Sequence, residues 1–161
     1  FDTIEHASFI DEEGIRLAKE RGTYLSMDIF NTEYTLSQGK ANGVLEENLA
    51  KERLVSQAQR DNFGKAHRAG VKMVFGSDAG VMPHETVGGQ FAVMVRFGMT
   101  PIEAIRAATV NAADALGQTG DVGTIAPGAW ADIVAVNGDP LRDPEVVQSV
   151  QAVVKGGVRV E

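Results

Sequence analysis

The sequence predicts an α/β fold in which three parallel strands alternate with helices, followed by a smaller β-rich segment. Segments of strand and helix character alternate up to Gly117, which is typical of parallel sheets with right-handed helical crossovers. Glycines, 18 of the 161 residues, are more frequent than average, and several of them stand where these segments end. After Gly117, turn residues and short β-rich stretches replace the helical spacing. We therefore expect a boundary between residues 1–118 and residues 119–161.

The first strand–helix–strand unit is predicted at the start of the chain. Residues 2–6 have the length and character of a strand. Asp11 suits the N-cap of a helix with acidic residues in its first turn, and Gly22 suits its C-terminal stop. Residues 23–30 (TYLSMDIF) are rich in β-branched and aromatic residues and are predicted as the second strand.

The next unit combines a polar connection, a long helix and a third strand. Residues 31–43 are polar and too numerous for a tight turn, so we expect a loop that covers a site. Apolar residues recur at mostly helical spacing over residues 44–69, and Gly70 is placed as the stop. Residues 71–75 are almost continuously apolar, as in a parallel strand covered on both faces. A loop over residues 76–80 (GSDAG) follows.

Two further helices and a β-rich tail complete the pattern. One helix is expected at about residues 86–97. A second begins at Thr100, where a capping box coincides with a proline at the first helical position, and Gly117 ends it. Beyond it, we expect strands at residues 132–136 and within residues 152–160.

Composition and charge exclude several classes of function. The hydrophobic content of 43% and the charged content of 23% indicate a folded domain. The formal net charge of −7 argues against nucleic acid as a partner, and no apolar stretch is long enough to span a membrane. The absence of cysteine excludes disulfides, thiolate metal sites and cysteine nucleophiles. It leaves the compartment open between bacterial cytoplasm and periplasm.

Polar residues follow the first and third predicted strands. His6 ends the first strand and Asp78 follows the third, at strand ends where functional groups collect in parallel α/β folds. If both strands turn these positions inward, an imidazole and a carboxylate converge at one rim. Such a pair suits a divalent ion such as zinc. His84, in the loop after Asp78, is a candidate for contact with a substrate.

On spacing alone, structural roles for these residues stay open. A histidine after a strand is more often a hydrogen-bonded structural residue than a ligand. Asp78 could be a turn residue that bonds to its own backbone, and His84 could lie exposed at the surface. The residues by themselves therefore do not identify an enzyme.

The predicted sheet is incomplete as a closed structure. Three parallel strands leave open hydrophobic edges, which favour aggregation unless another segment covers them. A closed eight-stranded α/β barrel needs about 200 residues or more, which 161 residues cannot supply. The chain starts at Phe1 instead of a methionine and without a leader segment. We expect Phe1 to be an internal position of a longer protein.

Four further segments stand in this order along the chain: residues 4–7 (IEHA), 75–80 (FGSDAG), 107–117 (AATVNAADALG) and 123–133 (GTIAPGAWADI). Taken together, they resemble the C-terminal part of the amidohydrolase superfamily. The resemblance spans essentially the whole chain and is closest to the branch of imidazolonepropionase-like proteins and Xaa-Pro or Xaa-Arg dipeptidases. Residues 81–85 (VMPHE) and 90–94 (QFAVM) are similar to that dipeptidase branch in particular.

The resemblance implies a (β/α)8 barrel of the TIM type that carries one or two divalent metal ions, with zinc the expected metal, and a small β-sandwich. Residues 1–118 are then the C-terminal half of the barrel, with its last three strands, and residues 119–161 are C-terminal strands of the sandwich. By position, His6 is implied as a metal ligand, and Asp78 as a metal ligand and the catalytic proton shuttle. The other ligands are implied to lie on the N-terminal half of the same protein.

The resemblance also implies the reaction. It is that of a metal-dependent hydrolase of carbon–nitrogen bonds, a dipeptidase (a metallopeptidase) or N-acyl amino acid hydrolase, acting on a small amide or dipeptide. A cyclic amidohydrolase or deaminase of the same superfamily is one alternative. Another is that the isolated chain is an inactive structural half that needs a complementary N-terminal chain. A homo-oligomer is left open, and neither nucleic acid nor a membrane is expected as a partner.

Overall fold

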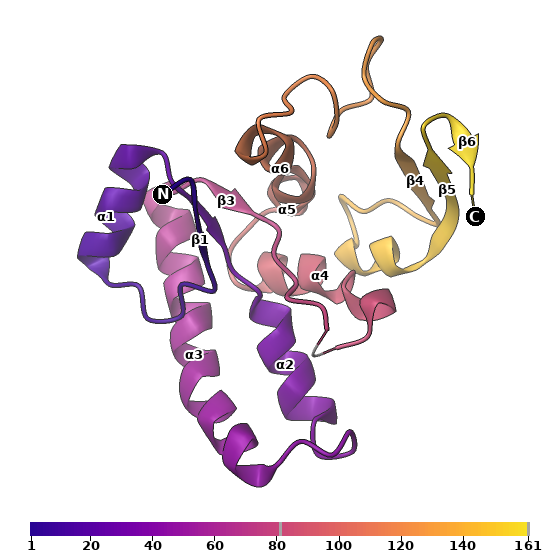
Figure 1. Cartoon of the computed structure of the whole chain (residues 1–161). Coiled ribbons are helices and arrows are strands. Elements are labelled where there is room, and N and C mark those ends of the chain that lie inside the picture. The colour runs from indigo at the N-terminus through magenta and orange to yellow at the C-terminus, as the bar shows by residue number, and fades with distance from the viewer. Residues whose placement is uncertain (81, 161) are drawn as a thin grey trace.

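The computed structural model describes residues 1–80 and 82–160, and it contains two separate sheets (Figure 1). The first is parallel and lies among helices α1 to α6, whereas the second is antiparallel and lies near the C-terminus. Val81, the first position of the VMPHE motif, and Glu161, the last residue of the predicted sandwich segment, lie outside the described residues. The α/β class with a parallel sheet is confirmed.

The parallel sheet has the strand order β1-β2-β3, and both strand pairs are parallel as predicted. Leu25 of the central strand pairs with Ile4 on one side and with Met73 on the other. All three strands are shorter than the segments predicted for them. Their bounds are β1 (Thr3–Glu5), β2 (Tyr24–Ser26) and β3 (Met73–Val74).

Helices α1 (Glu12–Arg21) and α3 (Glu46–Ala69) begin and end close to their predicted bounds. At the start of α1, the Asp11 carboxylate accepts a hydrogen bond from the Gly14 N–H at 2.8 Å. Both helices end at the predicted glycine stops, which adopt the left-handed conformation typical of that position. The predicted capping residues therefore define the start of α1 and the ends of both helices.

The segment after β2 differs from the prediction. The strand ends at Ser26, and helix α2 (Ile29–Gln38) occupies much of residues 31–43, where a loop was predicted. The buried face of α2 includes the polar residues Asn31 and Thr35, which hydrogen-bond to each other at 3.3 Å. Polar residues on a buried face hide the apolar periodicity by which a helix is recognised. The prediction of a loop was therefore wrong.

The next helices follow the predicted order with one division. A 3-10 turn, η1 (His84–Thr86), precedes α4 (Gly89–Arg96), so the helix predicted at residues 86–97 starts later. The predicted capping box at Thr100 is present at the start of α5 (Pro101–Ala108). The predicted single helix is interrupted at Thr109, and α6 (Val110–Ala115) continues after it. The Thr109 hydroxyl donates to the Ile105 carbonyl, a local bond that competes with helix continuation.

The core fills the space between the parallel sheet and the helices. Several of its apolar residues have no more than 1% of their surface exposed, among them Leu25, Met27, Ile29, Phe63 and Met94. Helix α2 packs against α3 and α4, and α1 packs against α3. In Figure 1, α2 runs away from the sheet, beyond the end where β1 and β2 finish, side by side with part of α3. This end carries the candidate site.

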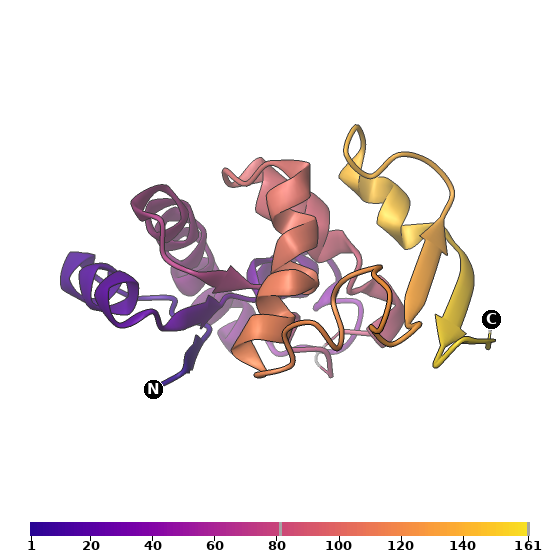
Figure 2. The same ribbon diagram turned by 90° about the horizontal axis from the view of Figure 1, so that it is seen from above.

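The C-terminal sheet has three antiparallel strands, β4 (Ile133–Val136), β5 (Val150–Lys155) and β6 (Val158–Arg159). A 3-10 helix, η2 (Pro144–Gln148), links β4 to β5 and packs against α4. Seen from above in Figure 2, this sheet lies at the end of the molecule opposite to α1. The predicted β-rich tail is confirmed, whereas the boundary between residues 118 and 119 stays a prediction. In the described part of the chain, no helix has the length and apolar character needed to cross a membrane.

Candidate functional site

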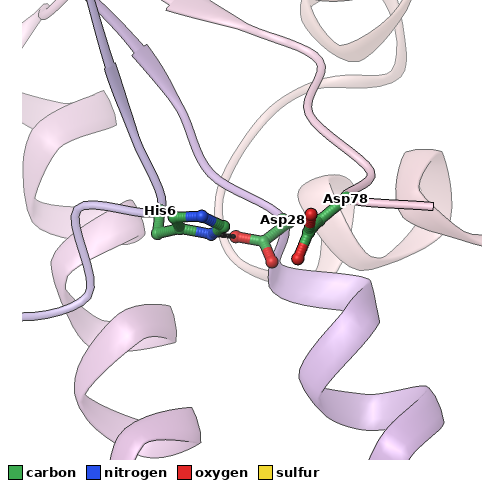
Figure 3. A group of neighbouring side chains, drawn as sticks. All are labelled: His6, Asp28 and Asp78. Carbon is green, nitrogen blue, oxygen red and sulfur yellow. Dashed lines mark hydrogen bonds and ion pairs between the residues drawn. The ribbon is translucent and has the colours of Figure 1, made fainter. Parts of the chain in front are cut away.

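Three polar side chains meet at the carboxyl edge of the parallel sheet. His6 follows β1, Asp28 follows β2, and Asp78 follows β3. One potential ligand atom from each of them lies within 4.8 Å of the other two. Figure 3 shows the Asp28 carboxylate between the His6 imidazole and the Asp78 carboxylate. The parallel register thus brings together groups that are far apart in the sequence.

The backbone is bent sharply where two of these side chains leave their strands. His6 has a φ angle of +60° and Asp78 one of +48°, both in the left-handed region that residues other than glycine rarely adopt. The His6 N–H still donates to the Ser26 carbonyl at 2.8 Å, so pairing with β2 continues one position beyond β1. Such conformations cost about 1–3 kcal/mol each and concentrate at functional sites.

Gly76 allows the segment after β3 to approach β2 closely. A Cβ atom at this position would lie 2.5 Å from the Ser26 Oγ and 3.3 Å from the Ser26 carbonyl carbon. Any larger residue would push the two segments apart. The glycine in the GSDAG motif therefore helps to place Asp78 beside the corner between β2 and α2.

His6 is held by a buried carboxylate. Its Nδ1 lies 3.0 Å from the Asp28 Oδ1, and the same oxygen accepts a hydrogen bond from the Gln59 Nε2 at 2.9 Å. The Asp28 side chain is 9% exposed, whereas the His6 side chain is 56% exposed. The hydrogen bond with Asp28 raises the pKa of His6, in opposition to the lowering caused by burial. The imidazole is thus tethered on its inner side and open on its outer side.

Asp78 is held by an amide from α2. The Asn31 Nδ2 lies 3.2 Å from the Asp78 Oδ2 and 3.3 Å from the Asp78 carbonyl oxygen. The Asn31 Oδ1 accepts a hydrogen bond from the Thr35 hydroxyl at 3.3 Å, which fixes the orientation of the amide. Asn31 itself is buried. The first turn of α2 therefore supports the carboxylate.

The three side chains lie between two hollows. The larger has a volume of about 470 Å³ and extends to residues of α2 and α3. The smaller, of about 210 Å³, lies toward Gly76 and Ser77. Glu52 of α3 lines the larger hollow, and burial together with the nearby Asp28 charge raises its pKa. The larger hollow offers space for a small polar substrate next to His6 and Asp78.

The donor groups fit a divalent cation. Imidazole nitrogen and carboxylate oxygen are ligands that zinc accepts. Because the Nδ1 of His6 faces Asp28, its Nε2 is the nitrogen left to bind an ion. A structural zinc site has four ligands and a catalytic site usually three from the protein. His6 and Asp78 can therefore form only part of such a site.

The structure brings His6 and Asp78 together, as the sequence predicts. Their roles as metal ligands, and that of Asp78 in catalysis, stay predictions. His84 begins η1, is exposed, and is not among the described residues that line either hollow, so its contact with a substrate also stays a prediction.

The sequence prediction missed Asp28, Asn31 and Gln59. Asp28 obeys the rule that identified the other two side chains, since it comes just after a strand of the parallel sheet. It was overlooked because the predicted strand ran on through residue 30. Asn31 and Gln59 lie on helices, and no sequence motif marks either residue.

The chain matches a protein family and is similar to several known proteins. The model of the amidohydrolase family matches residues 1–160. Ochratoxinase from Aspergillus niger is 36% identical over an alignment of 160 residues that covers 96% of this chain and 33% of ochratoxinase. A crystal structure of a Xaa-Pro dipeptidase with methionine bound in its active site has a TM-score of 0.92 and 37% identity, covering 99% of this chain and 40% of that one.

A second solved structure is also similar to this chain. The crystal structure of a prolidase complexed with N-methylphosphonate-L-proline has a TM-score of 0.89 and 33% identity, covering 99% of this chain and 40% of that one. The chain therefore spans between a third and two fifths of the length of these similar proteins.

Proposed function

The chain belongs to the amidohydrolase family, and from this premise we propose that it is the C-terminal part of a metal-dependent hydrolase of amide bonds. The expected substrates are dipeptides or N-acyl amino acids. The observation that carries the proposal is the convergence of His6, Asp28 and Asp78 at the carboxyl edge of the parallel sheet. Similarity to a Xaa-Pro dipeptidase, a prolidase and ochratoxinase supports this class of reaction.

The architecture of the whole protein is part of the proposal. Residues 1–118 are the last three strands of a (β/α)8 barrel with their helices, and residues 119–161 are strands of a small β-sandwich. The parallel order β1-β2-β3 and the separate antiparallel sheet support this division. An N-terminal half, with the remaining barrel strands and metal ligands, accounts for the greater length of the similar proteins.

The Nε2 of His6 and the carboxylate of Asp78 would hold the ion, together with groups from the N-terminal half. Zinc is the expected metal, as one or two ions. When bound, such an ion supplies Lewis-acid activation of a water molecule and of the scissile carbonyl group. This chain contributes the orientation of the two ligands, through Asp28 and Asn31.

Asp78 also has a proposed role in proton transfer. Its carboxylate accepts the proton of the attacking water and delivers it to the nitrogen of the departing amine, so that it acts first as a base and then as an acid. Asn31 binds one of its oxygens, Oδ2, at 3.2 Å, and no hydrogen bond to the other is seen within the described residues. A carboxylate fixed on one side and free on the other suits this sequence of transfers.

The substitution Asp78→Asn tests this role in the complete protein. It keeps the size of the side chain, so the fold should persist, whereas turnover should fall by about 10²–10⁴-fold or more because the proton shuttle is lost. Turnover of Xaa-Pro dipeptides, N-acyl amino acids and cyclic amides would be measured beside the circular dichroism spectrum. Activity close to that of the wild type would refute the assignment.

The substitution His6→Ala tests metal binding separately. It should lower the metal content per protein, measured by elemental analysis after dialysis, because one ligand is removed. His84→Ala is the matched control, since His84 lies outside both hollows and should leave the metal content unchanged. An unaltered stoichiometry in the His6→Ala protein would count against His6 as a ligand.

A further inference from the structure

We propose that Asp28 is a positioning residue that fixes the His6 imidazole in the tautomer protonated at Nδ1, so that the unprotonated Nε2 faces the ion site. Asp28 itself does not bind the ion. This inference rests on the proposed role of His6 as a metal ligand, and it adds the group that prepares His6 for that role.

The first argument is the chemistry of the contact between the two residues. An ionised carboxylate can only accept hydrogen bonds, whereas a neutral imidazole has one donor nitrogen and one acceptor nitrogen. The contact of 3.0 Å between the Asp28 Oδ1 and the His6 Nδ1 therefore requires the proton to sit on Nδ1. The lone pair of the neutral ring is then on Nε2, the nitrogen that remains available to a metal ion.

The second argument concerns what Asp28 is able to do in its surroundings. Its Oδ1 already accepts two hydrogen bonds, from His6 and from the Gln59 amide at 2.9 Å, and its side chain is only 9% exposed. His6, by contrast, is 56% exposed. The buried Asp28 therefore holds the pair in place, and the exposed His6 is the residue presented to a ligand.

Gln59, on α3, in turn supports the Asp28 carboxylate. The residue is 2% exposed, and its Nε2 donates to Asp28 while its Oε1 has no partner among the described residues. A reversed amide would point this oxygen at the carboxylate and lose the bond. The observed orientation therefore depends on Asp28 being an acceptor, and it holds the carboxylate toward His6. Partners of this kind, behind the ligands themselves, commonly change metal affinity when they are substituted.

The experiment compares Asp28→Asn with the wild type in the complete protein. The amide of the variant can donate to His6 Nδ1, which favours the tautomer protonated at Nε2 and blocks the nitrogen that binds the ion. Two quantities would be measured without substrate. They are the ¹⁵N chemical shifts of the His6 ring in metal-free protein, at a pH where the ring is neutral, and the zinc affinity by competition with a chelator.

The wild-type protein should show the tautomer protonated at Nδ1. In Asp28→Asn, this tautomer should lose population to the other one, and the zinc affinity should fall by about 10–100-fold. A wild-type ring protonated at Nε2 would overturn the proposal without any variant. So would a variant whose tautomer and zinc affinity both match the wild type. Loss of zinc with an unchanged tautomer would show that Asp28 is a direct ligand, which also overturns it.

A second variant keeps the proposal testable if Asp28→Asn does not fold. Gln59→Met preserves the length of the side chain and removes only the donor to Asp28, so zinc affinity should fall in the same direction but less. Gln57→Met is its matched control, because Gln57 lies on the exposed face of the same helix and donates to Asp61 instead. Equal zinc affinities in the two methionine variants would contradict the proposal.

These measurements separate this inference from the proposed function. None of them requires turnover, so the tautomer of His6 can be established in a protein that hydrolyses no peptide. A shifted tautomer in Asp28→Asn, together with no hydrolysis of any amide by the wild type, would reject the function and keep the positioning role. Hydrolysis by the wild type, together with an unchanged tautomer in Asp28→Asn, would keep the proposed function and reject the positioning role.

Discussion

Asn31 relates to Asp78 much as Asp28 relates to His6. Both are buried polar residues near the junction of β2 and α2, and each contacts a side chain that follows a different strand. Asn31 makes its two contacts with Asp78 through one amide group, whose oxygen is fixed by Thr35. The junction of β2 and α2 therefore orients both side chains with a proposed role in catalysis, His6 and Asp78.

The substitution Asn31→Leu should lower the turnover number by about 10-fold or more, since hydrogen bonds to a charged group contribute about 1.5–3 kcal/mol. The Michaelis constant should change less, because the amide contacts Asp78 and not the substrate. Steady-state kinetics would measure both quantities. Asn42→Leu, at an exposed position on the turn after α2, is the control. An equal turnover number in both variants would show that Asn31 is dispensable for positioning.

The sequence allows prediction of the site residues that follow strand ends. It does not allow prediction of the residues that act only by orienting another side chain. His6 and Asp78 were predictable because a parallel sheet brings the ends of its strands to one edge. Asp28 was predictable by the same rule, given a correct strand boundary. Asn31 and Gln59 were not, since their partners come from segments far away in the sequence and are chosen only when the helices pack.

At the level of elements, helices with marked ends were predicted well. Asp11 and Gly22 delimit α1, and Thr100 begins α5, each through a hydrogen bond or backbone conformation that the residue type favours locally. Helix α2 was missed because its buried face carries polar residues, and it also begins without a side-chain cap bond, since the Asp28 carboxylate at its N-cap hydrogen-bonds to His6 instead. The Asp28 side chain thus serves the site and does not cap its own helix.

The capping box of α5 provides a test at this level. The Glu103 carboxylate accepts hydrogen bonds from the Thr100 N–H and hydroxyl, each at 2.7 Å. These bonds, the backbone one first, lower the pKa of Glu103 below its ordinary value. A group with a lowered pKa stabilises the fold above its unfolded-state pKa, and this contribution disappears as the pH falls through the folded-state pKa.

The substitution Glu103→Ala should therefore lower the free energy of unfolding by about 0.3–1.5 kcal/mol near pH 7. The difference from the wild type should shrink as the pH falls through the range in which Glu103 takes up its proton. Urea denaturation at a series of pH values would measure it. Glu47→Ala, in the exposed first turn of α3, controls for helix propensity. A difference that stays constant down to pH 2 would contradict the role of the carboxylate.

At the level of the whole molecule, the edge of the sheet at β1 exposes apolar surface. Phe1 and Phe9 are largely exposed, and Ile4 of β1 is 38% exposed. An apolar hollow of about 490 Å³ lies between β1 and α1, lined among others by Ile4 and Leu17. In Figure 1, β1 is the outer strand, and no other described strand pairs with its free edge. Exposed edges of this kind favour association with another segment.

The last prediction concerns this edge. We expect the chain alone to bind zinc weakly and to be inactive, because His6 and Asp78 supply fewer ligands than a catalytic site needs. Adding the N-terminal half as a separate polypeptide should restore a stable complex, zinc binding and amide hydrolysis. Size-exclusion chromatography, elemental analysis and a dipeptidase assay would measure the three properties.

The surface that the N-terminal half covers can be tested with a pair of variants. Leu17→Glu places a charge in the apolar hollow beside β1 and should abolish the complex, since an unpaired charge buried at an interface is costly. Leu54→Glu is the matched control, because Leu54 is 77% exposed on α3, does not line this hollow, and should leave the complex intact. Equal association of the two variants would mean that the N-terminal half does not pack on α1. An active, zinc-loaded chain without any partner would mean that this chain alone supplies enough ligands, and the half-barrel proposal would then be wrong.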